Sequence, residues 1–559
     1  MYPVLFIIPN TANQFPGVVI AILLLSFITA LPLSYLVIFK YKGSLIKGMG
    51  YSSVKFVVPV ETIEKTEQEL FVEPRFNIIN ASQLPKDTSP IYLKLKETLG
   101  YHWFVYGAMC LVFASINAWC ILHQFETIGI WQFLYIGLVF FFPFLPVSFM
   151  LLANGMKQRL IIGAILGFLF ITSTYIIWAS AATNGMTFSS SLLPMLLYNI
   201  IPVCIISIFR LETIKALGLF IYSFFIICFS GPALFSFYLI TNPESMEAIG
   251  YKFIDMGFSA TTTLISWAAI SILIAGLVGW FLFKKIKNLY LQKKLNDIQL
   301  NADAVMLLFN ITYSLFISFD STTYALVSLL AFPVYKITGY ILFYFLRQRK
   351  VKAISPRLLI LRVFALGDDS KNLFERILKH WRYAGSIQMI SGPDLATTNL
   401  EPHEVISFVS GQLKNSYCED SESIEKNISN ADILPDLDGT HRVNEFFCRD
   451  NNWKEVLKKL VKNSEVVLMD LRKFSEKFKG CKYEIEALAK LVSFKKLIFI
   501  IDETTVISFT KEVFTNAFCM AGKGSINITE QQPVNLYKID KNKDMDALKI
   551  LNLLCSKID

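Results

Sequence analysis

Long apolar stretches fill the chain up to residue 346, and short apolar runs separated by polar segments follow. A transmembrane helix needs about 20 mostly apolar residues. Stretches of this kind lie at 17–39, 103–123, 131–153, 160–182, 191–209, 216–240, 262–283, 304–319 and 322–346. The pattern therefore predicts nine spans. The span at 304–319 is short and contains Asn310 and Ser314, so the side of the membrane on which the rest of the chain lies depends on it.

Beyond Lys352, apolar runs of strand length alternate with amphipathic helical segments. Strands are predicted at 357–366, 386–390, 466–471, 497–502 and 534–539, and helices at 370–385, 402–413, 453–463, from about 481, at 504–517 and at 545–554. This alternation is typical of a parallel, doubly wound α/β sheet. The polar, acidic stretch that ends near Asn444 has too few apolar residues to be expected in the core.

These patterns divide the chain into a first span (1–40), a loop or small cytosolic subdomain (41–101), eight further spans (102–346) and an α/β domain (353–559). The segment 41–101 contains two strand-like patches, Val54 to Val60 and Glu69 to Ile79, each with a proline. It is expected to form either a subdomain that packs on the α/β domain or a loosely ordered loop.

Composition and charge support this division. Charged residues make up 17% of the chain, against roughly 25% in soluble proteins, and nearly all the low-charge sequence precedes Arg347. Lys and Arg gather in the loops after alternate predicted spans, and the loops between these are uncharged or acidic. The positive-inside rule then predicts an external N-terminus and a cytosolic C-terminal domain in a multi-pass protein of the cell (inner) membrane. The N-terminus lacks the basic region of a cleaved signal peptide.

The predicted partner is thus the lipid bilayer. The net charge of +9 is explained by the basic loops, and no cluster of basic and aromatic residues indicates nucleic-acid binding. The nine cysteines include no CxxC pair, and a disulfide framework is not expected in a reducing cytosol.

Two motifs in the C-terminal domain resemble TIR domains. RVFALGDDS (362–370) looks like the first strand and the loop after it. FSEKFKGCKYEIEAL (474–488) is similar to the segment in which a serine-rich loop leads to Trp-Cys-x-x-Glu on a helix. Cys481 and Glu484 match that motif, and Gly480 stands where the family usually has Trp. The resemblance covers about 355–505 and implies a flavodoxin-like fold, with Glu484 as the catalytic residue and NAD as a substrate rather than a cofactor.

Helical spacing places Glu484 on the same face as Leu488 and Leu491, at the end nearest the strands. A glutamate at the mouth of a cleft can hydrogen-bond a ribose or stabilise an oxocarbenium-like transition state. The alternative is a carboxylate favoured by the helix dipole. Glu486 is expected to face solvent and to pair with Lys490.

Ligands of doubly wound sheets bind beyond the carboxyl ends of the strands. Residues expected to line this cleft with Cys481 are Gly367, Asp368, Asp369, Ser370 and Ser391. The loop 367–370 either positions a nucleotide ribose or caps the next helix. Its two acidic residues disfavour phosphate binding, and the glycine-rich phosphate motifs are absent from this domain.

The run Asp436-Leu437-Asp438-Gly439-Thr440 spells a phosphatase signature, DxDGT. That signature requires an apolar strand before it, and Pro435 stands there instead. A metal site formed by this run with His441 and Cys448 matches no strong template. We therefore expect a turn and no metal.

Lys336 is the one lysine deep in a predicted span. It either contacts an ion or substrate in a transporter, or snorkels or pairs with a neighbouring helix. The sequence hypothesis is a membrane protein with a TIR-like cytosolic domain that cleaves or senses NAD or a related nucleotide in a stress or defence response. The alternatives are a non-enzymatic signalling module that self-associates through the cytosolic domain, and a transporter or channel with a regulatory domain.

Overall fold

The computed structural model describes residues 15–49, 74–84, 89–123, 129–149, 156–181, 198–200, 202–204, 206, 217–241, 252, 255–257, 259–318, 321–348, 355–362, 376–391, 402–448, 452–522, 525–539 and 544–558. The chain forms two compact units. The helical unit comprises Met1–Tyr41, Trp103–Phe343 and Leu400–Ile406, and the sheet unit comprises Lys42–His102, Tyr344–Asn399 and Ser407–Asp559.

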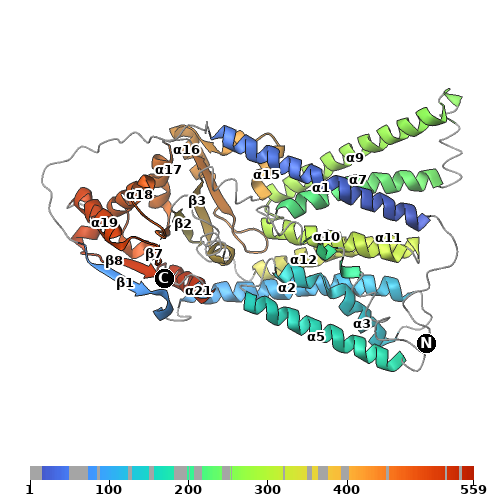
Figure 1. Cartoon of the computed structure of the whole chain (residues 1–559), viewed down its shortest axis with the longest axis horizontal. Helices are drawn as coiled ribbons and strands as arrows, with labels where there is room; N and C mark the ends of the chain where they lie inside the picture. The colour runs from blue at the N-terminus through green and yellow to red at the C-terminus, as the bar shows by residue number, and fades with distance from the viewer. Residues whose placement is uncertain are drawn as a thin grey trace. The chain divides into compact units, whose positions relative to one another are not determined.

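Rod-like helices make up the described part of the helical unit (Figure 1). They are α1 (Phe15–Gly48), α2 (Pro90–Leu122), α3 (Ile130–Phe141), α4 (Phe144–Val147), α5 (Met156–Ala181), α7 (Leu217–Thr241), α9 (Ala260–Leu291), α10 (Asp297–Ser318), α11 (Thr322–Leu329), α12 (Ala331–Gln348) and α15 (Pro402–Val409). The helix α2 contributes its residues up to His102 to the sheet unit. A lipid-embedded backbone must satisfy its hydrogen bonds within the segment, which explains why long apolar stretches fold as helices.

Four helical stretches in the described residues are long and apolar enough to cross a membrane: Pro90–Leu122, Ala269–Leu291, Asp297–Ser318 and Thr323–Phe345. The short predicted span at 304–319 is part of the third of these. Four other predicted spans coincide with helices. The span at 17–39 lies in α1, the span at 131–153 covers α3 and α4 together, the span at 160–182 matches α5, and the span at 216–240 matches α7. Most of the predicted span at 191–209 lies outside the described residues.

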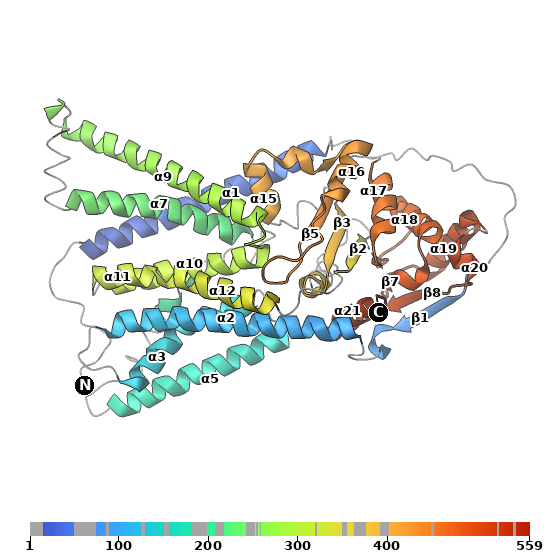
Figure 2. The same ribbon diagram turned by 180° about the vertical axis from the view of Figure 1, so that it is seen from behind.

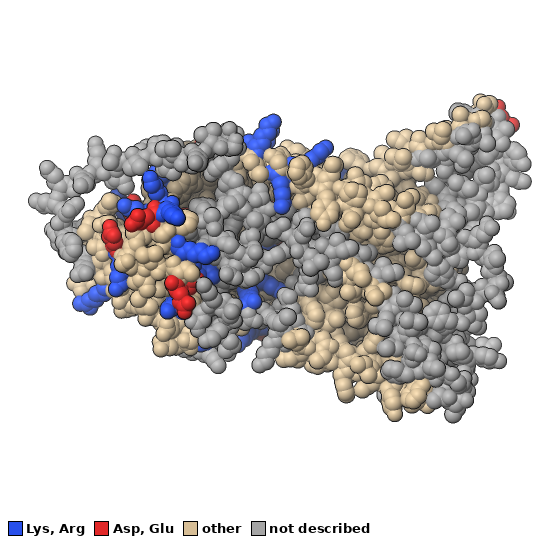
Figure 3. All heavy atoms as spheres, viewed as in Figure 1, with Lys and Arg blue, Asp and Glu red and all other residues tan. Residues whose placement is uncertain are grey.

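The centre of the helical unit is α10. It packs against α7 and α11, and nearly all of its side chains are buried. Figures 1 and 2 show it between α7 and α12 from both sides. Figure 3 shows that the visible described surface of this unit is mostly uncharged, as expected for a surface in lipid.

The sheet unit contains one all-parallel sheet of eight strands in the order β1-β8-β7-β6-β2-β3-β5-β4. The strands are β1 (Phe76–Asn80), β2 (Arg357–Arg362), β3 (Ser386–Ser391), β4 (Tyr417–Cys418), β5 (Val443–Cys448), β6 (Val466–Asp470), β7 (Leu497–Ile501) and β8 (Val534–Lys538). Its helices are α16 (Ser421–Ser429), α17 (Trp453–Asn463), α18 (Lys479–Leu491), α19 (Ile507–Ala521), α20 (Ile526–Thr529) and α21 (Asp544–Ser556).

Both faces of this sheet are covered. Residues of α17, α18 and α19 form one core with the sheet. Residues of α21, of the helical segment 376–381 and of the start of α2 form a second core. Strands buried on two faces need continuous apolar runs, and β6 (VVLMD) and β7 (LIFII) are buried at every position.

The polar stretch before Asn444 is where the core prediction is wrong. It contains β4 and α16 and leads directly into β5, and Cys418, Ile424 and Phe446 from these elements are buried in the first core. Few apolar residues suffice there, because short elements at the end of a sheet bury only one or two side chains each.

The segment between the first two predicted spans joins the same sheet. Phe76 of β1 pairs in register with Val534 of β8, and Ala81 and Tyr92 belong to the second core. For these residues the structure favours packing on the α/β domain over a loose loop. The patch Val54 to Val60 lies outside the described residues.

Candidate functional site

The carboxyl end of β6 lies at a change of direction in the sheet. From β2 the chain proceeds to β3 on one side, and from β6 it proceeds through β7 to β8 on the other. Such a switch point leaves a crevice at the carboxyl ends of the two central strands, where open α/β sheets bind ligands. Here Arg362, the last residue of β2, is the register partner of Asp470, the last residue of β6.

Asp470 forms a buried ion pair with Arg472. The Arg472 Nε donates to Asp470 Oδ1 at 2.9 Å and its Nη2 donates to Oδ2 at 2.7 Å. The Arg472 backbone N–H also donates to Oδ1 at 3.1 Å. A buried ion pair needs such well-directed hydrogen bonds to offset the loss of hydration. Neither residue was predicted from the sequence, although an acidic residue that ends an apolar strand was a usable signal.

Glu484 lies on the buried face of α18, the helix that follows β6. Helical spacing places Cys481, Glu484, Ile485 and Leu488 on this face, and the Glu484 side chain is only 3% exposed. The Cys481 thiol donates a hydrogen bond to its carboxyl group. The Glu484 Oε2 atom has no hydrogen-bond partner, and a buried polar atom of this kind in a folded protein requires an explanation.

Burial controls the protonation of Glu484 and Cys481. It raises the pKa of Glu484 to about 8, against the opposing effect of the Cys481 hydrogen bond. Burial also raises the pKa of the Cys481 thiol well above its usual value, and the neighbouring carboxyl groups of Glu484 and Asp470 raise it further. Glu484 is therefore mostly a neutral acid at pH 7 and can donate a proton or a hydrogen bond. We call Asp470, Arg472, Cys481 and Glu484 the β6–α18 cluster.

The other predicted site residues are placed as follows. Ser391 ends β3, and its Oγ donates to Glu445 Oε2 of β5 at 2.5 Å, a contact separate from the β6–α18 cluster. Gly367, Asp368, Asp369 and Ser370 lie outside the described residues. Glu486 is half-buried, so the expectation of a solvent-facing side chain is wrong. The charge that acts on it is Lys482, one turn earlier, rather than Lys490.

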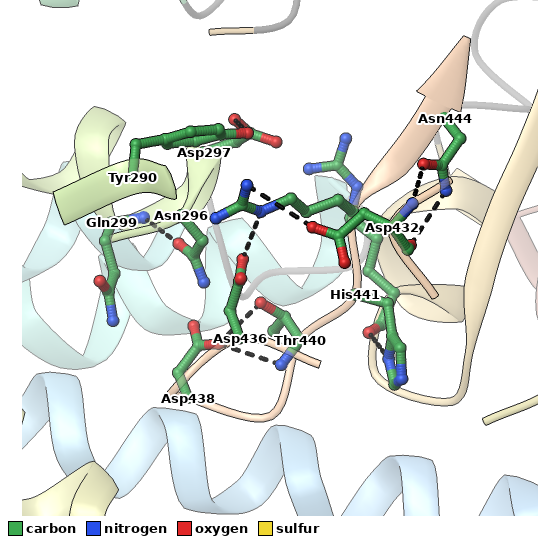
Figure 4. Close-up of polar contacts among 12 residues, drawn as sticks. Tyr290, Asn296, Asp297, Gln299, Asp432, Asp436, Asp438, Thr440, His441 and Asn444 are labelled. Atoms are coloured by element: carbon green, nitrogen blue, oxygen red, sulfur yellow. Dashed lines mark hydrogen bonds and ion pairs between the residues drawn. The ribbon is translucent and has the colours of Figure 1, made fainter. Parts of the chain in front are cut away.

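The DxDGT run forms a turn. The Asp436 N–H donates to Thr440 O at 2.8 Å, Gly439 has φ +85°, and Asp438 Oδ1 accepts from the Thr440 N–H and hydroxyl. Figure 4 shows Asp436, Asp438 and Thr440 together in this turn. The turn precedes β5 and follows no strand, so the phosphatase interpretation has no support. In the part of the chain that the structure describes, no group of three or more His, Cys, Asp or Glu residues fits a metal.

The turn is fixed by buried charges. Arg442 Nε lies 2.9 Å from Asp436 Oδ2, and Arg442 Nη1 lies 3.6 Å from Asp432 Oδ2. Figure 4 also shows Asn444 bonded to the backbone of Asp432. Burial raises the pKa of Asp436 to about 7, although Arg442 opposes this shift. These contacts hold the loop before β5 in one conformation.

In the helical unit, Lys336 is paired. Its Nζ lies 2.6 Å from Asp303 Oδ2 and joins α12 to α10. Other polar side chains of the helical unit are also hydrogen-bonded to one another. Ser328 Oγ donates to Asn117 Oδ1 at 2.6 Å, and the Tyr313 hydroxyl donates to Asn199 Oδ1 at 2.6 Å. The arrangement matches the expected pairing with a neighbouring helix. A cavity of about 340 Å³ in this unit has a largely apolar lining and does not include Lys336.

No protein-family model, curated protein sequence or solved structure matches this chain. Its class is therefore defined by its own features. They are those of a protein with apolar helices that could span a membrane and an all-parallel α/β unit.

Proposed function

We propose that this chain is a multi-pass protein of the cell inner membrane whose sheet unit is a TIR-like, flavodoxin-like domain in the cytosol. The domain would bind NAD or a related nucleotide and cleave its glycosidic bond in a stress or defence response. The observation that carries the proposal is the position of Glu484. It lies on the helix that follows the central strand β6, with a buried carboxyl group whose Oε2 has no hydrogen-bond partner.

The strand order supports the TIR-like fold. Without the outer strands β1, β4 and β5, the order is β3-β2-β6-β7-β8. Numbered along the chain, this is 2-1-3-4-5, the flavodoxin-type order. The Cys481–Glu484 motif then follows the third strand. The strands β4 and β5 are additions beside β3 that the resemblance does not imply.

The chemistry of Glu484 suits cleavage of a glycosidic bond. An ionised carboxylate next to the ribose would stabilise the oxocarbenium-like transition state. In the described conformation the carboxyl group is buried and mostly neutral at pH 7. A nucleotide reaches it only when the side chains packed on it rearrange, so we regard this conformation as the resting state.

The test uses the full-length protein in detergent micelles with NAD, and nicotinamide release is the measurement. The wild type is expected to release nicotinamide, and Glu484→Gln to slow release by at least about 100-fold, the usual effect of a lost acid or base. Glu486→Gln, two positions away on α18, is the matched control and should retain the rate. Unchanged release by Glu484→Gln would remove Glu484 from the mechanism.

A non-enzymatic module for assembly or nucleotide sensing is the second candidate. The burial of Glu484 favours this candidate, because a side chain that is only 3% exposed can equally have a purely structural role. This candidate predicts no nicotinamide release at any protein concentration, together with a nucleotide-induced change in melting temperature or oligomeric state.

A further inference from the structure

Cys418 and Cys448 are neighbours on adjacent strands of the sheet unit. They are register partners in the β4–β5 pair, and each is the last residue of its strand. Neighbouring strands lie about 4.8 Å apart, within the Cα separation of about 4.4–6.8 Å that a disulfide bridges. Both residues are free thiols in this structure and belong to the same buried core, and the Cys448 thiol donates to the carbonyl oxygen of Phe446 at 3.7 Å.

The surroundings give the two sulfur atoms different roles. The Asn427 Nδ2 atom lies 3.7 Å from the Cys418 sulfur and donates to it. The neighbouring Cys448 thiol and the hydrogen bond from Asn427 lower the pKa of the Cys418 thiol, although burial opposes them. The pKa of the Cys448 thiol is raised well above its usual value by the neighbouring Cys418 and by burial. Cys418 is thus the better thiolate, and the thiolate is the reactive form.

We propose that Cys418 and Cys448 are a redox modification site, at which hydrogen peroxide closes a reversible disulfide between β4 and β5. The Cys418 thiol loses its proton, the thiolate attacks one peroxide oxygen and the O–O bond breaks; the departing hydroxide takes up that proton, so a sulfenic acid and water form. The Cys448 sulfur then attacks the sulfenic sulfur, the S–O bond breaks, and a second water leaves. Two thiols and one peroxide thus become one disulfide and two waters, as on the usual oxidation path of cysteine.

The exposure of the two cysteines and the position of β4 in the sheet fit this chemistry. Cys448 is 8% exposed and Cys418 is fully buried, so a water-sized oxidant approaches from the side of Cys448. The strand β4 has only two residues and lies at the end of the sheet. A disulfide would fasten this short strand and close a loop that contains α16 and the Asp436–Thr440 turn. Reversible bonds of this kind are the usual form of disulfides in a reducing compartment.

The experiment treats the purified full-length protein with graded hydrogen peroxide, blocks the remaining thiols with N-ethylmaleimide and maps peptides by mass spectrometry without reduction. The expected result is a linked pair of peptides that contain Cys418 and Cys448, and its loss after dithiothreitol. Cys418→Ser and Cys448→Ser should each abolish the link. Cys519→Ser, on α19, is the matched control and should retain it.

Three results would overturn the proposal. One is oxidation of Cys519 while Cys418 and Cys448 remain fully alkylated. Another is a Cys418–Cys448 link that forms only between two copies, which a mixture of isotope-labelled and unlabelled protein detects. The third is a link that persists in dithiothreitol. If either serine variant fails to fold, peptide mapping of the wild type alone decides the outcome.

Discussion

His102 and Asp438 form a buried contact in which the imidazole ring lies between two acceptors. The ring Nε2 lies 3.5 Å from Asp438 Oδ2, and Nδ1 lies 2.9 Å from the carbonyl oxygen of Thr98. This contact joins α2 to the turn before β5.

The carboxyl group of Asp438 predicts an acid-sensitive contribution to stability. Burial alone would raise the pKa of Asp438, but hydrogen bonds from His102 and Thr440 outweigh it and hold the pKa below its usual value. A carboxyl group with a depressed pKa in the folded state stabilises the fold above its unfolded pKa of about 3.9 and loses that effect as the pH falls. Asp438→Asn should therefore lower the free energy of unfolding by about 3 kcal/mol at pH 7, and the loss should shrink below about pH 4.

Thermal unfolding of the detergent-solubilised protein across this pH range measures the effect. The exposed Glu476→Gln is the control and should differ little from the wild type. An Asp438→Asn variant as stable as the wild type at pH 7 would contradict a stabilising carboxylate at Asp438.

Glu484 predicts the opposite pH dependence. Its pKa is raised to about 8 in the folded state, so its favourable contribution is complete below the unfolded pKa of about 4.3 and is lost as the pH rises towards 8. Glu484→Gln, which stays neutral, should become more stable than the wild type as the pH rises, by about 3 kcal/mol at pH 7. Melting curves from pH 4 to 9 test this, with Glu486→Gln alongside. A constant difference between Glu484→Gln and wild type over that range would show that the pKa of Glu484 is the same in the folded and unfolded protein, and would contradict the raised pKa.

Lys336 and Asp303 should be energetically coupled. Either Lys336→Met or Asp303→Leu leaves one unpaired charge in the helical unit and should lower the free energy of unfolding by about 3 kcal/mol. The double variant leaves none and should recover at least half of the loss. A double-mutant cycle from melting or denaturant curves measures this coupling. Additive losses would mean that the ion pair contributes nothing to stability.

Two glycines offer a matched pair of substitutions. A Cβ atom at Gly385, just before β3, would lie 1.9 Å from the backbone oxygen of Pro356, so Gly385→Ala should destabilise the sheet unit by at least about 2 kcal/mol. At Gly480, inside α18, a Cβ atom meets nothing within 4 Å. Gly480→Ala should stabilise the protein by about 0.5–1 kcal/mol, the usual gain from replacing a helical glycine. Limited proteolysis and melting curves compare the two variants, and equal effects would contradict the geometry around Gly385.

Local pattern was sufficient to locate most helices and strands of the sheet unit. The predicted helix 453–463 has the bounds of α17, and the predicted strands at 466–471 and 497–502 each exceed β6 and β7 by one residue. A buried strand or an amphipathic helix imposes its period on a few consecutive residues, so its position can be found without knowledge of its neighbours. The burial of Glu484 followed from the same spacing.

The polar pairings elsewhere in the chain depend on neighbours that are distant in the sequence. The β1–β8 pair brings Asn77 to Asn535, the turn before β5 brings Asp438 to His102, and α10 brings Asp303 to Lys336. Each pairing requires the path of the whole chain, because a short segment's own pattern does not specify which partner it meets. The sequence by itself therefore determined the apolar helices, the α/β class and the buried face of α18. Only the tertiary structure decided the strand order, the neutral state of Glu484 and the partners of the buried charges, because burial and pairing are properties of surroundings that the fold assembles.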